Sequence, residues 1–160
     1  MVADYLTAAN IAGLGKVFAS PPKISRSLDA LANVPAGTPS GAVVYVEIYH
    51  SSEVRIAVGG PVAGKKLVTH DLRLHLLARS TQLLAEDAMD DHDVLVEAIL
   101  ALLRADRTLG STGASSAPIF QNGEGDAGII VDVGLPFETG SGTTNCWTSI
   151  ETECVEFITA

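Results

Sequence analysis

The residues most suggestive of chemistry form a glycine-rich stretch at 59–66, Gly-Gly-Pro-Val-Ala-Gly-Lys-Lys, which fits the pattern G-x-x-x-x-G-K. A phosphate-binding loop of this pattern needs a serine or threonine after the lysine to hold magnesium, and a helix must follow it. Here Lys66 stands in place of the hydroxyl residue, Pro61 removes one backbone amide, and an alternating strand pattern follows. We therefore interpret the stretch as a turn between two strands.

The four histidines do not form a recognisable metal or acid–base motif. His70 and His75 are five residues apart on an expected strand, so their side chains point to opposite faces and cannot share one metal. His50 and His92 fall in different elements, and no motif joins either one to a pair of carboxylates. In one alternative, the chain is a small cytoplasmic enzyme that uses His70 or His75 together with Asp71 for acid–base catalysis.

The cysteines and a run of aspartates are the remaining candidates. Cys146 and Cys154 are too few for a disulfide framework and lack the spacing of a zinc site. No signature of a cysteine nucleophile surrounds Cys146. The acidic run at 87–93 has the composition of a calcium loop but lacks its glycine and its final glutamate. We expect no catalytic residue, no cofactor and no metal.

The elements that would position these residues follow from the spacing of apolar side chains. A helix is expected at 4–19, and a second helix from Asp90 or Asp91 to Gly110, with the stripe Val94, Leu95, Ala98, Ile99, Leu102 and Leu103. Strands are expected at 42–50, 54–58, 68–78, 117–121, 129–133 and 148–159, with a turn at Ser51 and Ser52. This order predicts an α+β fold: a largely antiparallel sheet with helices packed on one face, and extended loops or arms.

The length of 160 residues fits a single domain over 1–160 that can bury a core without a metal or a disulfide. Two stretches extend beyond that core, a proline-rich arm or loop at 21–41 and a glycine-rich loop at 110–128. The start of the chain has no secretory signal pattern, and no apolar run reaches about 18 residues. We therefore expect a protein that is made in the cytoplasm and stays soluble.

The formal net charge of −9 is distributed unevenly along the chain. All 10 lysines and arginines lie at or before Arg107, where the 12 acidic residues leave a balance of −2, and the remainder carries −7. The acidic residues of that remainder are Glu124, Asp126, Asp132, Glu138, Glu151, Glu153 and Glu156. Binding of nucleic acid is disfavoured, because phosphate binding relies on surplus lysine and arginine. The asymmetry predicts one surface with a negative field.

Two stretches of the chain resemble the tail terminator proteins of long-tailed bacteriophages. The first is Ser-Glu-Val-Arg-Ile-Ala-Val-Gly-Gly-Pro at 52–61, followed by Lys65, Lys66 and the alternating strand at 68–78. The second is Leu-Leu-Arg-Ala-Asp-Arg-Thr-Leu-Gly at 102–110, similar to that family's helix exit, L-R-x-D-x-T-L-G. In element order the resemblance covers residues 42–135, whereas the arm at 21–41 and the cysteine-containing C-terminus lie outside it.

The resemblance implies a small α+β subunit without catalytic activity that forms a hexameric ring on the end of the tail tube of a virion. Its implied partners are further copies of itself, the tail tube protein and the head–tail connector protein, and genome DNA passes through without specific binding. An acidic lining would repel the DNA phosphates, so we expect several of the seven carboxylates beyond Arg107, all of them candidates, to face the lumen. Candidate interface residues are Arg55, Lys65, Lys66, Arg104 and Arg107.

Four alternatives remain open beside this expectation. A head–tail connector or stopper protein of the phage neck also forms rings and differs in the surface to which it docks. A small cytoplasmic enzyme would need a pocket that joins His70 or His75 to Asp71. A generic ligand-binding α+β domain lies between these two classes, and a monomer with long loops would explain the arms without any assembly.

Overall fold

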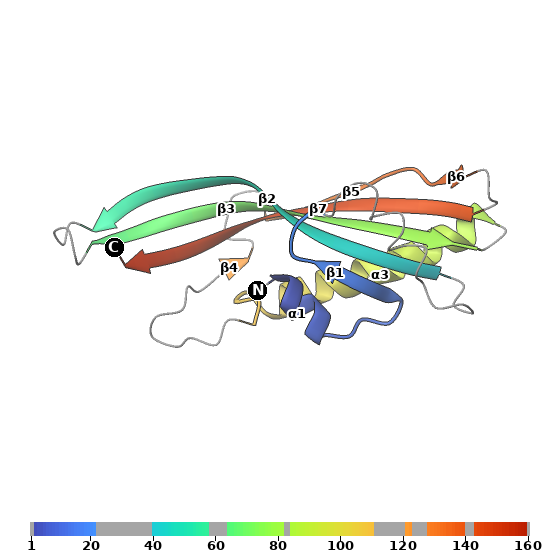
Figure 1. Cartoon of the computed structure of the whole chain (residues 1–160), viewed down its shortest axis with the longest axis horizontal. Coiled ribbons are helices and arrows are strands. Elements are labelled where there is room, and N and C mark those ends of the chain that lie inside the picture. The colour runs from blue at the N-terminus through green and yellow to red at the C-terminus, as the bar shows by residue number, and fades with distance from the viewer. Residues whose placement is uncertain are drawn as a thin grey trace.

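A long, twisted sheet with helices against one face makes up the chain in the computed structural model (Figure 1). The structure describes residues 2–21, 40–57, 64–81, 84–110, 121–122, 128–139 and 143–159. Its helices are α1, Val2–Ala8, and α3, Ala85–Ala105. Its strands are β1, Leu14–Phe18; β2, Ser40–Ala57; β3, Lys65–Ser80; β4, Gln121–Asn122; β5, Ile129–Val133; β6, Phe137–Thr139; and β7, Thr143–Thr159.

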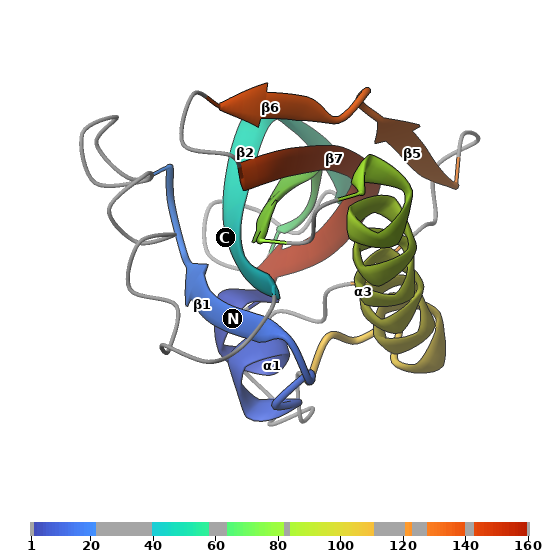
Figure 2. The same cartoon turned by 90° about the vertical axis from the view of Figure 1, so that its right-hand side faces the viewer.

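The strands run in the order β1-β2-β3-β7, and β4, β5 and β6 each pair with β7. Strand β1 is parallel to β2, and every other described pair is antiparallel. Viewed along the strands, α3 lies on the β7 side of the sheet and α1 on the β1 side (Figure 2). The expected α+β fold, a largely antiparallel sheet with helices on one face, is confirmed.

The sequence of β3 explains how the sheet divides into two faces. Its leucines at 72, 74 and 76 are each 1% exposed and pack against the helices, whereas Arg73 and His75 point the other way. Burying each leucine contributes about 1.5–3 kcal/mol. From the helices, the core receives Leu6, Leu95, Val96, Ile99, Leu100 and Leu103. The period-two pattern expected at 68–78 is therefore confirmed, and β3 extends beyond it at both ends.

The helix expected at 4–19 is wrong beyond its first two turns. Helix α1 ends at Ala8, and the chain then passes through Asn10 and Gly13, which have φ of 49° and 85°. Such left-handed backbone interrupts a helix. The following residues form β1 instead, where Val17 pairs with Val44 in the parallel register. Leu14 and Val17, which fit the helical spacing, pack against the core from this short strand instead.

The expected turn at Ser51 and Ser52 is also wrong, because β2 is one continuous strand. Both serines pair with β3, opposite His70 and Thr69. Neither serine supplies the positive φ that a tight hairpin requires, and the long partner strand holds both in extended backbone. In place of a turn, the strand has a β-bulge at Tyr49, just before the two serines. The bulge bends the strand without ending it. Of the expected strand at 54–58, residue 58 lies outside the described residues.

Helix α3 begins five residues before Asp90, the earlier of the two expected caps. Glu86 and Asp87 in the first turn are favourable against the helix dipole, and the N-cap position, Leu84, makes no side-chain capping hydrogen bond. At the other end the helix stops at Ala105 rather than Gly110. The Asp106 carboxylate accepts hydrogen bonds from the backbone N–H groups of Thr108 and Gly110, at 2.9 and 2.8 Å, and so holds the exit turn.

The apolar stripe of α3 is rotated relative to the expected one. Val94 is 72% exposed, whereas Val96 and Leu100 are buried. The buried stripe also includes His92, and it includes Ala88 because the helix starts earlier than expected. Among the described helices, none has the length and apolar character needed to cross a membrane.

Parts of the sequence-based expectations fall outside the described residues. This holds for residues 22–39 of the arm at 21–41, and for 111–120 and 123–127 of the loop at 110–128. Of the strand expected at 117–121, only residue 121 is described, as the first residue of β4. The strand at 129–133 is confirmed as β5. The last strand begins at Thr143, five residues before the expected start.

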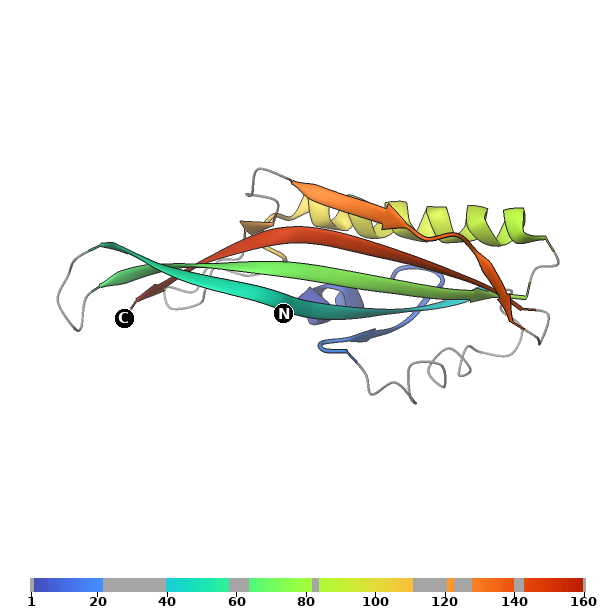
Figure 3. The same ribbon diagram turned by 90° about the horizontal axis from the view of Figure 1, so that it is seen from above.

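At one end the sheet projects beyond the helices. Figures 1 and 3 show β2, β3 and β7 continuing together past α1 and α3, with the C-terminus at this end. The 16 residues of β3 span roughly 50 Å, whereas the 21 residues of α3 span roughly 30 Å. The difference in rise per residue lets the ends of these three strands extend beyond α1 and α3, the helices that the structure describes.

Candidate functional site

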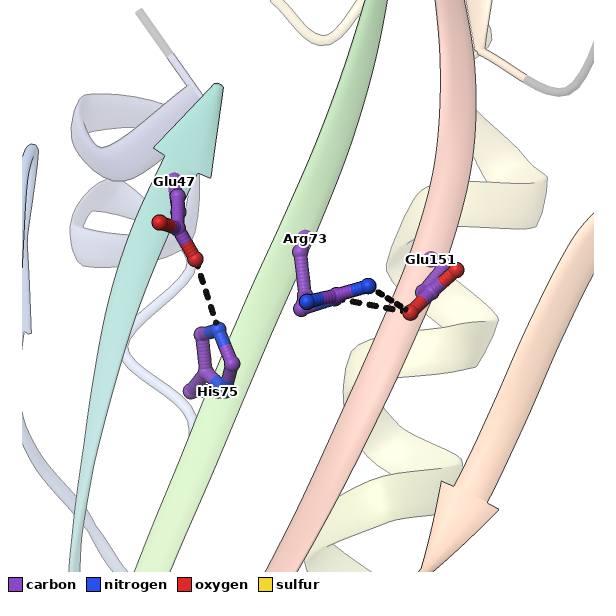
Figure 4. A network of polar contacts seen from close by, with 4 residues as sticks. All are labelled: Glu47, Arg73, His75 and Glu151. Atoms are coloured by element: carbon purple, nitrogen blue, oxygen red, sulfur yellow. Dashed lines mark hydrogen bonds and ion pairs between the residues drawn. The ribbon is translucent and has the colours of Figure 1, made fainter. Parts of the chain in front are cut away.

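The strongest polar cluster lies on the face of the sheet turned away from α1 and α3, here called the outer face. Cross-strand partners share a face, so the register assigns Glu47, Arg73 and Glu151 to one row on this face. His75 lies in the neighbouring row, two residues along β3. Figure 4 shows the four side chains converging over the middle strands, with the helices behind the sheet.

Two charged contacts tie these strands together. Arg73 donates from Nη2 and Nε to Oε1 of Glu151, at 2.6 and 2.7 Å (Figure 4). His75 Nε2 lies 3.1 Å from Oε2 of Glu47. All four side chains are partly shielded, between 20 and 36% exposed. Strand β3 is thereby linked through side chains to β7 on one side and to β2 on the other.

Aromatic rings complete this cluster. The ring of Tyr45 stacks on that of His75, with centroids 4.4 Å apart and 17° between the planes. The Arg73 guanidinium lies 4.6 Å above the Tyr49 ring. Burial, then the Glu47 carboxylate, raises the pKa of Tyr45; burial, then the Glu151 and Asp71 carboxylates, raises the pKa of Tyr49. Both phenols are therefore neutral at physiological pH and supply stacking and hydrogen bonding rather than charge.

The middle of the outer face is acidic. The register adds three more carboxylates to Glu47 and Glu151, because Asp71 pairs with Glu153 and Asp132 pairs with the outer-face residue Ser149. Five carboxylates thus surround Arg73 in this part of the described sheet. Three of the seven residues expected to face a lumen, Asp132, Glu151 and Glu153, therefore share one surface.

The other four residues of that acidic set are placed differently. Glu156 pairs with Val68, and Glu138 with Thr144, so the register puts both on the helix side of the sheet. Glu124 and Asp126 lie outside the described residues. A single lining surface therefore cannot contain all seven carboxylates, since alternate strand residues point to opposite faces.

The candidate interface residues do not gather at one place. Arg55 and Lys66 are cross-strand partners at the projecting end, where Lys66 Nζ lies 2.6 Å from Oε1 of Glu53. Lys65, the first residue of β3, precedes Lys66 and is exposed. Arg104 lies 3.5 Å from Glu97, two turns back on α3, and Arg107 is exposed on the turn after that helix. The five basic residues form two groups.

The histidine–aspartate pair required by the enzyme alternative is not assembled. His70 and Asp71 are adjacent on β3 and point to opposite faces, and four residues of extended strand, about 13 Å, separate Asp71 from His75. Each histidine instead has a glutamate from another strand. His70 contacts Ser51 Oγ through Nδ1 at 2.8 Å and Glu156 Oε2 through Nε2 at 3.4 Å.

These histidine–glutamate pairs were missed by sequence reasoning. Glu47 is 28 residues before His75, and Glu156 is 86 residues after His70. Once β2 and β7 are aligned beside β3, the row Glu47–Arg73–Glu151 has the alternation of charge that favours cross-strand pairing. That signal requires the register of strands far apart in sequence, which local patterns do not contain.

The buried histidine and cysteines lie on the helix side of the sheet. His92 is 1% exposed and its Nε2 shares a 2.7 Å hydrogen bond with Thr148 Oγ1; burial lowers its pKa and keeps it neutral. Burial raises the pKa of the Cys146 thiol and raises that of Cys154 to about 12. Both cysteines are therefore protonated and unsuited to nucleophilic attack or metal binding.

A small cavity opens beside His92 and Cys146. Its volume is about 170 Å³, and apolar side chains of β2, β3 and α3 make up much of its wall, among them Ala42, Ala78 and Leu95. Within the described residues, no group of three or more histidine, cysteine, aspartate or glutamate side chains is placed to hold a metal ion. The outer face is therefore the better candidate for function.

Comparisons with known proteins add no relative. No model of a known protein family matches the chain. A search of curated proteins found no significant match.

Proposed function

We propose that this chain is a structural subunit that assembles head-to-tail into a ring and serves as a tail terminator of a phage virion. One observation carries the proposal: large apolar side chains are exposed on two different surfaces at opposite ends of the sheet. Exposed apolar surfaces of this kind mark sites of protein association. The specific role, termination of the tail, comes from the resemblance of residues 52–61 and 102–110 to phage tail terminator proteins.

The first surface is a row of side chains across the projecting end of the sheet, here called the apolar row. Val54, Leu67 and Phe157 are successive cross-strand partners on the outer face. Val54 is 56% exposed and Phe157 is 48% exposed. Because neither α1 nor α3 lies beneath this part of the sheet (Figures 1 and 3), the row sits on a three-stranded projection of the described chain that is suited to reach a neighbour.

The second surface lies around β5 and β6 and is here called the apolar margin. Its members are Leu135, Phe137 and Trp147, which are 88, 53 and 39% exposed. The margin is rigid at its centre, because the Gly134 N–H donates to the Trp147 carbonyl at 3.0 Å and the indole ring packs over Gly134. It therefore offers a preformed surface to a partner.

The difference between these two surfaces favours a head-to-tail arrangement. A twofold dimer buries the same patch on both copies, whereas the apolar row and the apolar margin have different shapes and lie at different ends. When the row of one copy covers the margin of the next, every copy makes both contacts. Such an interface closes into a ring if the rotation between copies divides a full turn.

In this ring the acidic part of the outer face lines the channel. Asp132, Glu151 and Glu153 stand there with Glu47 and Asp71, so DNA phosphates are repelled from the wall. This arrangement lets DNA pass without specific binding. A ring structure with these carboxylates on its outer rim would contradict the lumen assignment.

The axial surfaces of the ring meet the tail tube protein on one side and the head–tail connector protein on the other. The two basic groups, Arg55 with Lys65 and Lys66 and Arg104 with Arg107, suit ion pairs with acidic groups of these partners or of the adjacent subunit. Arg107→Glu is expected to reduce ring assembly while the monomer stays folded. Unchanged assembly in size-exclusion chromatography would count against a role for Arg107.

The mass of the assembly in solution tests the proposal directly. Native mass spectrometry of the purified chain is expected to show a hexamer. The double variant Val54→Ser and Phe157→Ser is expected to shift the population to monomer. The matched control is Val94→Ser, since Val94 is 72% exposed on α3 and belongs to neither surface. A monomeric parent protein would overturn the proposal.

A second experiment separates the terminator from a neck connector, which would also form a ring. Purified protein is added to polymerising tail tube subunits, and tube lengths are measured by electron microscopy. A terminator caps the tubes, so their mean length falls as its concentration rises. Unchanged tube length together with binding to the head side would favour the connector.

A further inference from the structure

The two edges of the sheet carry unpaired backbone in the part of the chain that the structure describes. On one side, β1 pairs only with residues 42–45 of β2, so residues 46–57 have β3 on one flank and no described strand on the other. On the opposite side, β5 pairs with β7 alone. Free strand edges present backbone N–H and C=O groups that can pair with another chain.

The apolar layer of the sheet stops abruptly at the β2 edge. Ile48 pairs with Leu72 and so lies on the helix side, yet it is 58% exposed, whereas Leu72 is 1% exposed. Tyr49, at the bulge, is 46% exposed. A strand added beside β2 would cover Ile48 and continue the buried layer.

The opposite edge offers a strand of matching character. Ile130 and Val133 of β5 are 43 and 50% exposed, and Asp132 between them is exposed as well. The bulges at Tyr49 and Ile56 leave residues 50–55 of β2 in regular register, a run long enough for the five residues of β5. Bulges commonly restrict where an edge can pair, so this run is the segment left available.

We infer that in the ring β5 of one copy pairs with the free edge of β2 in the next copy, so that the sheet continues from subunit to subunit. This inference rests on the proposed ring, and it names the contact between copies. The occupant is a second copy because the two edges are unlike, each carries exposed apolar side chains among polar ones (Ile48, Tyr49 and Val54 on β2, Ile130 and Val133 on β5), and one chain supplies both. Each copy then uses its two free edges once.

The directions of the strands are consistent with this junction. Strand β5 is antiparallel to β7, β7 to β3, and β3 to β2, so β5 runs opposite to β2 within one copy. Rotation about a ring axis leaves the direction of a strand along that axis unchanged. The junction between copies is therefore antiparallel, and the outer-face residues of both strands stay on one surface.

Cysteine cross-linking tests the pairing. On the outer face the register places His50, Ser52 and Val54 of β2, and Ile130 and Asp132 of β5. Each of the three β2 positions is combined with each of the two β5 positions, giving six double-cysteine variants. Paired strands bring Cα atoms to about 4.5–5.5 Å, within the range that a disulfide spans. The native cysteines are both buried.

After mild oxidation, at least one double variant is expected to give a ladder of covalent oligomers up to six chains on a non-reducing gel. Its two single-cysteine parents are expected to give no ladder. The matched control combines Ser51→Cys with Asp132→Cys, because Ser51 is exposed but lies on the opposite face. Native mass spectrometry of each variant before oxidation reports whether the ring is present.

The outcomes separate the two proposals. A ladder in an outer-face pair but not in the Ser51 control supports the strand junction. Hexamers by mass without a ladder in any of the six variants would overturn the junction and leave the proposed function standing. Monomers by mass for the parent protein would overturn both.

Discussion

Arg73 and Glu151 lie on neighbouring strands and make a forked contact, in which two nitrogens of the guanidinium donate to a single carboxylate oxygen at 2.6 and 2.7 Å. The same guanidinium covers the Tyr49 ring. One side chain of β3 therefore joins β7 to the bulge of β2. It also offsets part of the negative charge of the acidic outer face.

The first prediction concerns the stability that Arg73 provides. Arg73→Ala should lower the free energy of unfolding by about 1–2 kcal/mol, because it removes a partly shielded ion pair and a cation–π contact and leaves the neighbouring carboxylates uncompensated. Urea unfolding followed by circular dichroism measures the change. Asp90→Ala, at an exposed position of α3, is the control and should change stability by less than about 0.5 kcal/mol.

A double-mutant cycle with Glu151→Ala isolates the pair. We expect a coupling of about 0.5–1 kcal/mol that shrinks at high salt, since the two side chains are 33 and 23% exposed. A coupling of zero at low salt would show that the contact contributes nothing and that the acidic face is held by other interactions.

The second prediction concerns the contact of Gly134 with Trp147. A Cβ at Gly134 would overlap the indole ring, so Gly134→Ala should cost about 1–3 kcal/mol by forcing the ring or the strand to move. Trp147 is the single tryptophan of the chain, and its fluorescence reports the displacement directly. In a Trp147→Ala background, which lacks the ring, Gly134→Ala should cost much less. Val94→Ala, at a side chain 72% exposed on α3 and outside both apolar surfaces, is the neutral control.

The third prediction concerns pH. Burial lowers the pKa of His92 in the folded protein, so below about pH 6.5 the unfolded chain binds the proton more readily and the folded state loses stability as pH falls. The slope from this one group is at most about 1.4 kcal/mol per pH unit. His92→Gln should remove that slope between pH 7 and 5. Denaturant unfolding at several pH values measures it.

The matched control for His92 is His50→Gln, because His50 is exposed. This variant should keep the pH dependence of the parent protein. If His92→Gln and the parent protein had the same slope, the buried imidazole would not be the group responsible.

The fourth prediction tests the rotation of the α3 stripe. Ile99→Ala, at a fully buried side chain, should cost about 2–5 kcal/mol, because it leaves a cavity between α3 and the sheet. Val94→Ala belongs to the stripe expected from sequence but is 72% exposed, and should change stability by less than about 0.5 kcal/mol. Thermal unfolding of both variants measures the contrast. Equal losses would favour the expected stripe.

Local patterns in the sequence were sufficient for several elements. The alternation at 68–78 predicted β3 and its two faces, and therefore the separation of His70 from His75. The strand at 129–133 was also predicted correctly. These predictions succeeded because the period of two is a property of extended backbone and needs no distant partner. The α+β class followed from the order of the elements.

Element boundaries and the polar cluster could not be predicted in the same way. The turn predicted at Ser51 and Ser52 is replaced by a continuous strand, because β3 supplies a backbone partner along almost all of β2. The helix predicted at 4–19 is divided, because residues 14–18 gain a partner in β2. In both cases a long-range pairing overrode the local preference.

By itself, the sequence determined the alternation of β3, the α+β class and the concentration of acidic residues beyond Arg107. Only the tertiary structure decided that Asp132, Glu151 and Glu153 share a surface while Glu138 and Glu156 face the other way. It also decided that Arg73 meets Glu151 and that His75 meets Glu47. The physical reason is register: residues 28 to 86 positions apart become neighbours only when strands are aligned, and a shift of one residue would move each side chain to the opposite face.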